Sequence, residues 1–153
     1  MLLFVEFEGV LRRPRREPSG SLDGQLIANF EAILRRFSRV QLVLASEWRL
    51  RLPHPRIMEW FHGDIRARFG VRLGLDDRPR GDLARAYLER LGKPTPWAAL
   101  DADASAWGPD EPGLFLCDPA RGLDAEAAAD LSRHLVARAV AARAARRGAA
   151  PGI

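Results

Sequence analysis

The chain has 153 residues, 47% hydrophobic and 29% charged, a length typical of one domain and a composition that excludes a disordered chain. The formal net charge of +4 does not by itself indicate a nucleic-acid-binding protein. A single cysteine, Cys117, excludes an intramolecular disulfide, and no apolar run approaches the roughly 20 residues that span a membrane. We therefore expect a cytoplasmic protein with no membrane partner, and the oligomeric state stays open.

The first third of the chain alternates apolar runs with segments that break regular structure. Residues 2–7 form a short apolar run that leads into a turn, which predicts a buried strand. Residues 12–24 are rich in Arg, Pro, Gly and Ser, which predicts a loop. Apolar residues recur at helical spacing over residues 25–37, and residues 40–45 predict a second buried strand that is closed by Ser46.

The middle of the chain predicts two helices and two strands. An apolar stripe at helical spacing covers residues 57–69 and ends at Gly70, a position at which glycine commonly ends a helix. Residues 71–75 suit a short strand, residues 82–91 a helix, and residues 97–100 a third apolar strand.

The last third completes the alternation of strands and helices. Residues 114–117 predict a further strand and residues 124–147 a long helix, and we expect residues 148–153 to be a disordered tail. Such alternation indicates βαβ units. The predicted fold class is therefore α/β, a Rossmann-like three-layer sandwich with a mostly parallel sheet, and residues 1–147 form a single domain.

Polar side chains follow three of the predicted strands: Glu6, Ser46 and Asp101. Ligands bind at the carboxyl ends of the strands in an open parallel sheet, so we expect these groups to share one edge. Glu6 and Glu8 suit phosphoryl transfer, with one carboxylate as nucleophile and metal ligand and the other as general acid/base. Asp101 would complete a Mg²⁺ site of hard oxygen ligands. The alternative is that both glutamates are solvated residues that leave a strand.

Five segments together resemble the haloacid dehalogenase-like (HAD) superfamily. Residues 3–11, Leu-Phe-Val-Glu-Phe-Glu-Gly-Val-Leu, resemble its first motif, a strand followed by Asp-x-Asp-Gly-Val-Leu. Residues 42–49 resemble the second motif of one branch, where a strand ends in Ser-Ser-Ser-Trp-Arg, and residues 80–83 are similar to its Arg-Gly-x-Glu-Ile. Residues 97–103 resemble its strand followed by Asp, and residues 122–123 also fit. This branch comprises small, capless HAD domains of bacteria and phages and of fused RNA-repair proteins.

The resemblance implies roles for the residues of the first two motifs. Glu6 stands at the position of the nucleophile and metal ligand. Glu8 stands at the position of the general acid/base, and its backbone carbonyl is implied as a further metal ligand. Ser46 stands at the position that binds the phosphoryl group, and Ala45 is the alternative for that alignment.

The remaining motifs imply how the phosphate and the metal are held. Arg80 is implied as the basic residue that neutralises the phosphate, Asp101 as a ligand of Mg²⁺, and Asp103 as a ligand that acts through water. The implied function is a Mg²⁺-dependent phosphohydrolase for a phosphorylated, macromolecular substrate such as a nucleic-acid end, because a capless site is open to large molecules.

The sequence departs from the family pattern at the nucleophile. The family has Asp at both acidic positions of the first motif, whereas Glu6 and Glu8 stand there in this chain. An added methylene displaces a carboxylate by roughly 1 Å, and a misplacement of about 1 Å can lower a rate about 10²-fold. Ala45 and Ala102 also replace polar residues of the branch. The competing hypothesis is a catalytically degenerate HAD domain that binds nucleic acid or a protein partner, through the arginine-rich loop 12–16.

The last predicted helix is basic. It carries five arginines: Arg133, Arg138, Arg143, Arg146 and Arg147. We expect a solvated basic face here, with an RNA-binding surface as the alternative.

Overall fold

A computed structural model describes residues 1–148 of the chain. Five strands form one sheet in which all neighbouring strands are parallel. They are β1 (Leu2–Val5), β2 (Gln41–Leu44), β3 (Phe69–Arg72), β4 (Trp97–Asp101) and β5 (Leu114–Leu116). The strand order is β3-β2-β1-β4-β5, so the chain first moves outward from β1 to β3 and then crosses to the other side of β1. The switch point lies between β1 and β4, where open α/β sheets bind their ligands.

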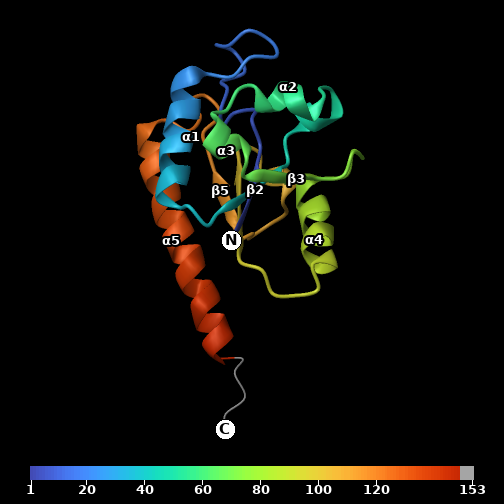
Figure 1. Cartoon of the computed structure of the whole chain (residues 1–153), viewed down its shortest axis with the longest axis vertical. Helices are drawn as coiled ribbons and strands as arrows, with labels where there is room; N and C mark the ends of the chain where they lie inside the picture. The colour runs from blue at the N-terminus through green and yellow to red at the C-terminus, as the bar shows by residue number, and fades with distance from the viewer. Residues whose placement is uncertain (149–153) are drawn as a thin grey trace.

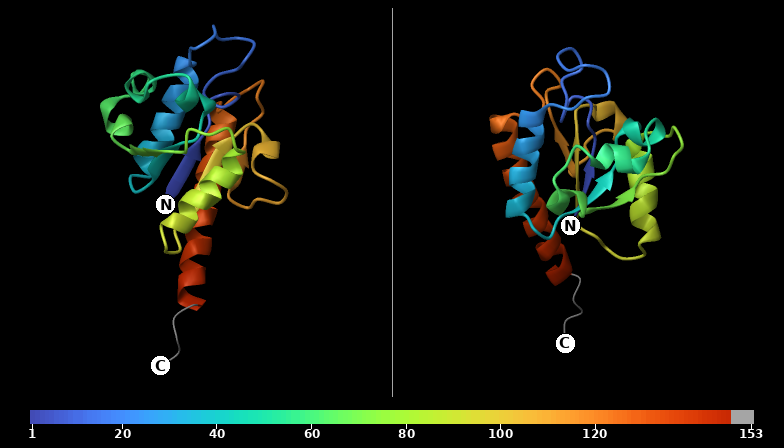
Figure 2. Two further views of the ribbon diagram at one scale, coloured as in Figure 1. Left: turned by 90° about the vertical axis from the view of Figure 1, so that its right-hand side faces the viewer. Right: turned by 45° about the horizontal axis from the view of Figure 1, so that its top comes forward.

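Five α-helices and two short 3₁₀ turns complete the described structure. The helices are α1 (Gly24–Arg36), α2 (His54–Met58), α3 (Gly63–Arg66), α4 (Arg80–Arg90) and α5 (Ala125–Gly148), and the turns are η1 (Glu47–Leu50) and η2 (Ala104–Ala106). Helices α1 and α5 lie on one side of the sheet and α4 on the other (Figure 1, Figure 2). The predicted three-layer, mostly parallel α/β fold is therefore confirmed.

The two faces of the sheet belong to two separate cores because successive side chains of a strand point to opposite faces. Leu3 and Val5 of β1 pack into the larger core with the apolar stripes of α1 and α5. Phe4, between them, packs into the smaller core with Leu83 of α4 and with Trp107. Burial on both faces explains why the central strands read as continuous apolar runs.

The segment of residues 54–72 differs from the predicted single helix. It forms the two short helices α2 and α3, and Phe69 and Gly70 belong to β3, so the prediction of a helix ending at Gly70 was wrong. The apolar residues of the stripe are nonetheless buried together in the larger core. The spacing of these apolar residues therefore identified the buried side chains correctly, but it did not indicate a continuous helix.

A buried carboxylate stabilises the break between α2 and α3. Glu31 of α1 is 1% exposed, and its Oε1 accepts a hydrogen bond from the backbone N–H of His62 at 2.8 Å. Its Oε2 lies 2.6 Å from Nδ1 of the same histidine. Gly63 follows at the start of α3, and glycine disfavours a continuous helix at this position. A tertiary contact from another helix therefore overrides the local pattern.

The segments between the strands carry only short helices and turns, and no further domain is inserted within residues 1–148. The absence of a cap domain agrees with the prediction for this part of the chain. Gly148, which was predicted to begin the tail, is the last residue of α5, and residues 149–153 lie outside the described residues. Among the helices of residues 1–148, none has both the length and the apolar content needed to cross a membrane.

Candidate active site

Four of the predicted site residues meet at the carboxyl ends of the central strands. Glu6 follows β1, Ser46 follows β2, Asp101 ends β4, and Arg80 is the first residue of α4. Glu6 is 3% exposed, and Ser46 and Asp101 are fully buried. The guanidinium of Arg80 lies between the two acids, and we call these three residues the Glu6–Arg80–Asp101 cluster.

Arg80 binds the two buried carboxylates with different geometries. Its Nε and Nη2 donate to Oδ2 and Oδ1 of Asp101 at 2.8 and 3.1 Å, a bidentate pair. Its Nη1 lies 3.3 Å from Oε2 of Glu6. Two exposed acids, Glu47 and Asp103, approach the same guanidinium at 3.7 and 3.8 Å. One arginine thus faces four carboxylates, and the buried Arg49 is the second cation near Glu6 and Glu47.

The longer side chain of Glu6 folds back onto its own turn. Its Oε1 accepts hydrogen bonds from the backbone N–H groups of Phe7 at 2.7 Å and Glu8 at 3.2 Å. Burial raises the pKa of Glu6, while the charge of Arg80 and the hydroxyl of Ser46 oppose that rise. Glu6 is consequently easier to protonate than an ordinary glutamate, and only its Oε2 faces the cation.

Asp101 is fixed in place by the loop that follows β4. Its Oδ1 accepts from the backbone N–H groups of Ala102 at 2.7 Å and Asp103 at 3.0 Å, and its Oδ2 accepts from the indole Nε1 of Trp107 at 2.6 Å. Trp107 is 1% exposed, and a buried indole N–H requires such an acceptor. Together with Arg80, these donors hold the carboxylate in one orientation.

Two glycines permit the close approach of backbone segments around the cluster. Gly9 has a φ of 72°, and a Cβ there would lie 2.5 Å from Cβ of Ala102, so only glycine lets the turn after β1 pack against the loop after β4. A Cβ on Gly81 would lie 2.8 Å from Cα of Trp107. The start of α4, and with it Arg80, is thereby seated directly on the backbone that carries Trp107.

Ser46, and not Ala45, presents a polar group to the cluster. The side chain of Ala45 is buried in the smaller core with Phe4 and Val43. The hydroxyl of Ser46 accepts a hydrogen bond from the backbone N–H of Trp48 at 3.3 Å, at the start of η1. The same hydroxyl lowers the pKa of the Glu6 carboxyl and so opposes the effect of burial.

Glu8 and Asp103 lie at the rim of the Glu6–Arg80–Asp101 cluster, with side chains that are about half exposed. The side chain of Glu8 is 45% exposed and accepts from Nε of Arg12 at 2.9 Å and from the indole Nε1 of Trp48 at 3.1 Å. Asp103 accepts from the backbone N–H and hydroxyl of Ser105, at the start of η2. Of the predicted metal ligands, therefore, Glu6 and Asp101 are the two that are buried against Arg80, whereas Asp103 approaches it only at 3.8 Å from the rim.

The arginine-rich loop after the first motif is partly engaged in holding itself together. Arg12 is 7% exposed, and its Nη1 donates to the carbonyl oxygens of Pro18 at 2.6 Å and Ser21 at 3.3 Å. Arg13 pairs with Glu17 and Asp23. Two of the four arginines predicted to receive an anion are thus structural, which leaves the exposed pair at positions 15 and 16 for such a role.

The carboxylate oxygens of the cluster are the type of ligand that a hard divalent cation prefers. Two buried carboxylates from neighbouring strands, Glu6 and Asp101, converge on one positive charge. Mg²⁺ usually keeps several waters and is bound by one or two carboxylates together with phosphate oxygens. Within residues 1–148, no group of three or more potential ligand side chains is brought together, so water and substrate would have to supply the other ligands.

Three other residues shape the site; the sequence did not indicate Trp107 or the contact between Glu47 and Arg80, whereas for Arg49 it favoured a structural role over one in the site. Trp107 binds Asp101, and Glu47 approaches Arg80. Arg49 is 4% exposed and donates to the carbonyl oxygens of Ala45 and Gly74 at 2.8 and 2.9 Å, beneath the turn that holds Ser46. A buried tryptophan or arginine must find polar partners, but the identity of those partners depends on the tertiary fold.

The fold and the site define a Rossmann-like α/β domain with buried acidic and basic groups at the switch point between β1 and β4. The family described as "HAD domain in Swiss Army Knife RNA repair proteins" matches residues 2–128. The chain belongs to this family, which confirms the resemblance read from the five sequence segments. No curated protein sequence and no solved structure matched the chain.

Proposed function

We propose that the chain is a phosphohydrolase that removes a phosphate group from the end of a nucleic acid. The observation that carries the proposal is the convergence of Glu6, Ser46, Arg80 and Asp101 at the carboxyl edge of the sheet. The description of the family supports the substrate class, because it places such domains in RNA-repair proteins. The absence of an inserted domain within residues 1–148 supports a large substrate, since the edge is not covered by a cap.

The charge of the site favours the use of Mg²⁺. Four carboxylates surround Arg80, and a phosphate monoester brings a further charge of about −1.5 to −2. A divalent ion held by Glu6 and Asp101 would supply the charge neutralisation that lets a phosphate enter. Arg80 would then be available to pair with phosphoryl oxygens, for which its planar guanidinium is well suited.

In the proposed reaction, Glu6 is the nucleophile and Glu8 transfers the protons. Oε2 of Glu6 attacks the phosphorus atom, the bond to the leaving oxygen breaks, and Glu8 donates a proton to that oxygen. Water then hydrolyses the phosphoryl group on Glu6, with Glu8 accepting a proton, and inorganic phosphate leaves. Ser46 and Arg80 hold the phosphoryl oxygens throughout. Glu8 must leave its partners Arg12 and Trp48 to take part, and its half-exposed side chain has room to do so.

The test compares phosphate release from a 3′-phosphorylated oligonucleotide and from an aryl phosphate, each with Mg²⁺ and with excess chelator. We expect the native chain to release phosphate only with Mg²⁺ and Glu6→Ala to lose at least about 10²-fold in rate. Glu6→Asp restores the usual family residue and reports whether the longer side chain limits the rate. A silent native chain that Glu6→Asp makes active would contradict the proposal and establish a degenerate site.

The degenerate site is the second candidate function, and one observation favours it. Oε1 of Glu6 is held by the backbone of its own turn and Oε2 by Arg80, so no oxygen of the nucleophile is free in this arrangement. A chain of this kind would bind a phosphorylated end without turnover. It would retain the 3′-phosphorylated oligonucleotide in preference to its dephosphorylated form, with no phosphate released.

A further inference from the structure

The C-terminal half of α5 extends beyond the amino-end edge of the sheet (Figure 1, Figure 2). A helix of 24 residues is about 36 Å long, whereas a five-residue strand such as β4 spans about 17 Å. In α5, only Leu131 and Leu135 are buried. Beyond them the helix is mainly alanine and arginine, and Val136 and Val140 are 52% and 60% exposed. This half of the helix is therefore not held by a hydrophobic core.

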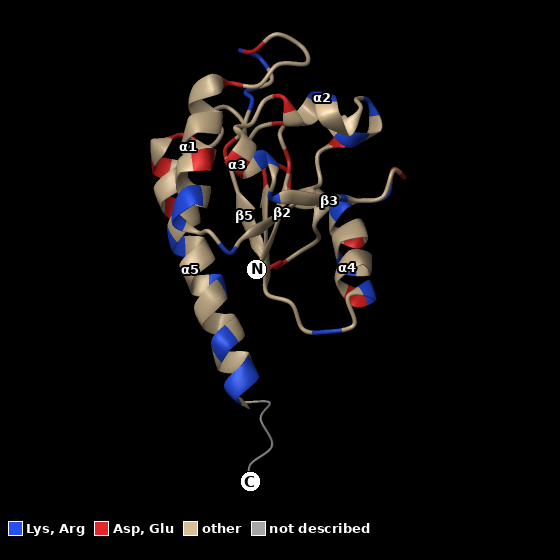
Figure 3. Cartoon of the chain, in the orientation of Figure 1, with Lys and Arg blue, Asp and Glu red and all other residues tan. Residues whose placement is uncertain are grey.

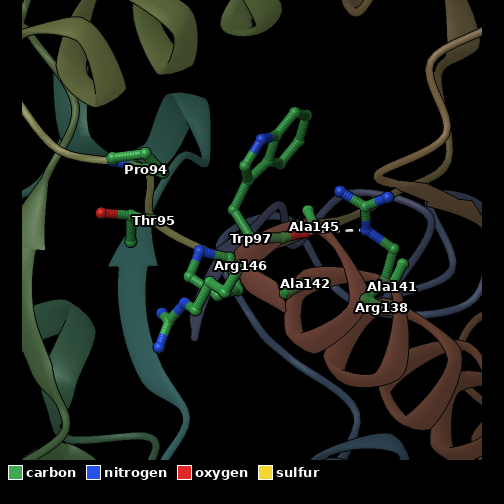
Figure 4. A pocket seen from close by; sticks show the side chains of 9 residues that line it. Pro94, Thr95, Trp97, Arg138, Ala141, Ala142, Ala145 and Arg146 are labelled. Carbon is green, nitrogen blue, oxygen red and sulfur yellow. Dashed lines mark hydrogen bonds between the residues drawn. The ribbon is translucent and has the colours of Figure 1, made fainter. Parts of the chain in front are cut away.

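Two open grooves flank this half of α5. One, of about 490 Å³, lies between α5 and residues 94–97 and is shown in Figure 4. The other, of about 440 Å³, lies between α5 and residues 36–40. Pro96, Ala142 and Arg146 line both, so the two form one continuous surface. We call this surface the α5 grooves.

The charge of the α5 grooves has one sign only. Five arginines line them: Arg36, Arg39, Arg138, Arg143 and Arg146. No Asp or Glu lines either groove, and within residues 1–148 none of these five arginines has a carboxylate within 4.0 Å. Figure 3 shows the basic residues along this half of the helix and acidic residues at its start. By contrast, Arg121 and Arg133, near the start of α5, do pair with carboxylates.

Such an arrangement favours a polyanionic ligand. Like charges that face one another without counter-charges raise the energy of the free surface, and a chain of phosphates lowers it. The ring of Trp97 borders one groove with the guanidinium of Arg138 5.9 Å from its centroid, while the ring itself is partly buried and stacks on Trp107. A positively charged groove that follows the backbone is typical of proteins that bind single-stranded nucleic acid without sequence preference. A lipid surface is disfavoured because helices that lie on membranes carry large apolar residues opposite their basic face, and here that face is mostly alanine.

We infer that the α5 grooves bind the sugar-phosphate backbone of a single-stranded nucleic acid without regard to its sequence. The surface lies at the amino end of β4, around Trp97, whereas the Glu6–Arg80–Asp101 cluster lies at the carboxyl end of the same strand. The chain thus has two sites for anions at opposite edges of one sheet. The α5 grooves do not depend on turnover at the cluster. In its second half, the last helix would then be the RNA-binding surface that the sequence left open as the alternative to a solvated face.

The experiment measures the binding of a fluorescently labelled single-stranded RNA that has hydroxyl groups at both ends, by anisotropy, between about 50 and 200 mM salt. Arg143→Ala/Arg146→Ala removes two groove arginines, and alanine preserves the helix. Its matched control, Arg56→Ala/Arg72→Ala, removes two exposed arginines elsewhere on the surface. We expect the groove variant to bind at least about tenfold more weakly at low salt. The slope of log K against log salt should fall in magnitude by about 1.4.

Four outcomes would overturn the inference. The first is no binding by the native chain at low salt, and the second is a groove variant that binds as the native chain does. The third is an equal loss in the control variant, which would assign the effect to overall charge. Tighter binding of the native chain to anionic lipid vesicles than to RNA would also overturn it. Because the RNA has no terminal phosphate, the result is independent of whether the Glu6–Arg80–Asp101 cluster is catalytic.

Discussion

Arg80 is the residue on which the candidate active site depends most directly. It is 12% exposed at its side chain and bridges Glu6 and Asp101, two carboxylates that neighbouring strands bring to the same edge. Buried charges of one sign must be compensated, and in the described structure Arg80 supplies the direct ion pairs, with the charge of Arg49 near Glu6 adding to them. Arg80 therefore holds the two carboxylates in place in the free site and, under the proposed function, also binds the phosphate.

Replacement of Arg80 by methionine should destabilise the fold and increase its response to Mg²⁺. The change leaves two buried carboxylates unpaired, which should lower the free energy of unfolding by about 3–5 kcal/mol in urea denaturation. Mg²⁺ should restore more stability to this variant than to the native chain, because the guanidinium no longer occupies both carboxylates.

Arg78→Met is the matched control for Arg80→Met. Arg78 stands two residues earlier and pairs with Asp76 on the surface, where both side chains are about half exposed. Its loss should change stability by no more than about 0.5 kcal/mol. An equal effect of the two substitutions, or no added response of Arg80→Met to Mg²⁺, would show that the cluster is not a site for a cation.

The stability of the chain should also depend on the protonation of Glu6. Its pKa lies above the ordinary value of 4.5 because it is buried, so the folded chain holds this proton more tightly than the unfolded chain. The stabilisation is complete below 4.5 and is lost as the pH rises through the raised pKa. Glu6→Gln does not titrate. The stability of this variant relative to the native chain should therefore increase from about pH 4.5 upward in urea denaturation. A difference that is constant or decreases with pH contradicts the assignment.

At the scale of the elements, the start of α4 is the junction that seats Arg80. Gly81 packs on the backbone of Ala106 and Trp107, and Trp107 in turn binds Asp101. The absence of a side chain at Gly81 thus lets α4 pack directly on the loop that follows β4. The helix begins with Arg80 and the loop follows Asp101, so this packing brings two members of the cluster together.

Gly81→Ala should destabilise the fold although alanine is the better helix former. The added Cβ would lie 2.8 Å from Cα of Trp107 and 3.0 Å from two carbonyl oxygens, all of them backbone atoms that cannot turn aside. We expect a loss of about 1–3 kcal/mol in urea denaturation. Gly63→Ala is the control, because its Cβ meets no atom within 4 Å, and it should be neutral or stabilising by up to about 1 kcal/mol. The reverse order of the two variants would contradict this packing.

The sequence predicted the elements well where the pattern was local and poorly where tertiary contacts decided the outcome. Strands and long helices were found because buried positions leave periodic apolar patterns. The break between α2 and α3 was missed because it depends on Glu31, a buried acid from another helix. The motifs located Glu6, Ser46, Arg80 and Asp101 near one edge, but the contact of Glu47 with Arg80 came only from the folded structure.

For the whole molecule, the parallel sheet separates two charged regions. Its carboxyl edge holds an acidic cluster around Arg80, and its amino edge holds the arginines of the α5 grooves. Because all strands run in one direction, the segments that follow β1, β2 and β4 supply the acids of the first region, and the segments that precede the same strands line the second. A nucleic acid that contacts both regions would have to pass around the sheet, so the two sites can be tested separately.

Under the proposed function, Glu6 accepts a phosphoryl group and becomes covalently labelled. This intermediate is trapped by mixing the chain, with Mg²⁺, with an oligonucleotide radiolabelled in its 3′-phosphate, quenching in acid and measuring the label bound to protein. We predict label on the native chain, slower labelling of Glu8→Gln because Glu8 is the acid of the first step as well as the base of the second, and no label on Glu6→Ala. Release of labelled phosphate that Glu6→Ala leaves intact, or no release and no labelled protein from the native chain, would contradict the claim.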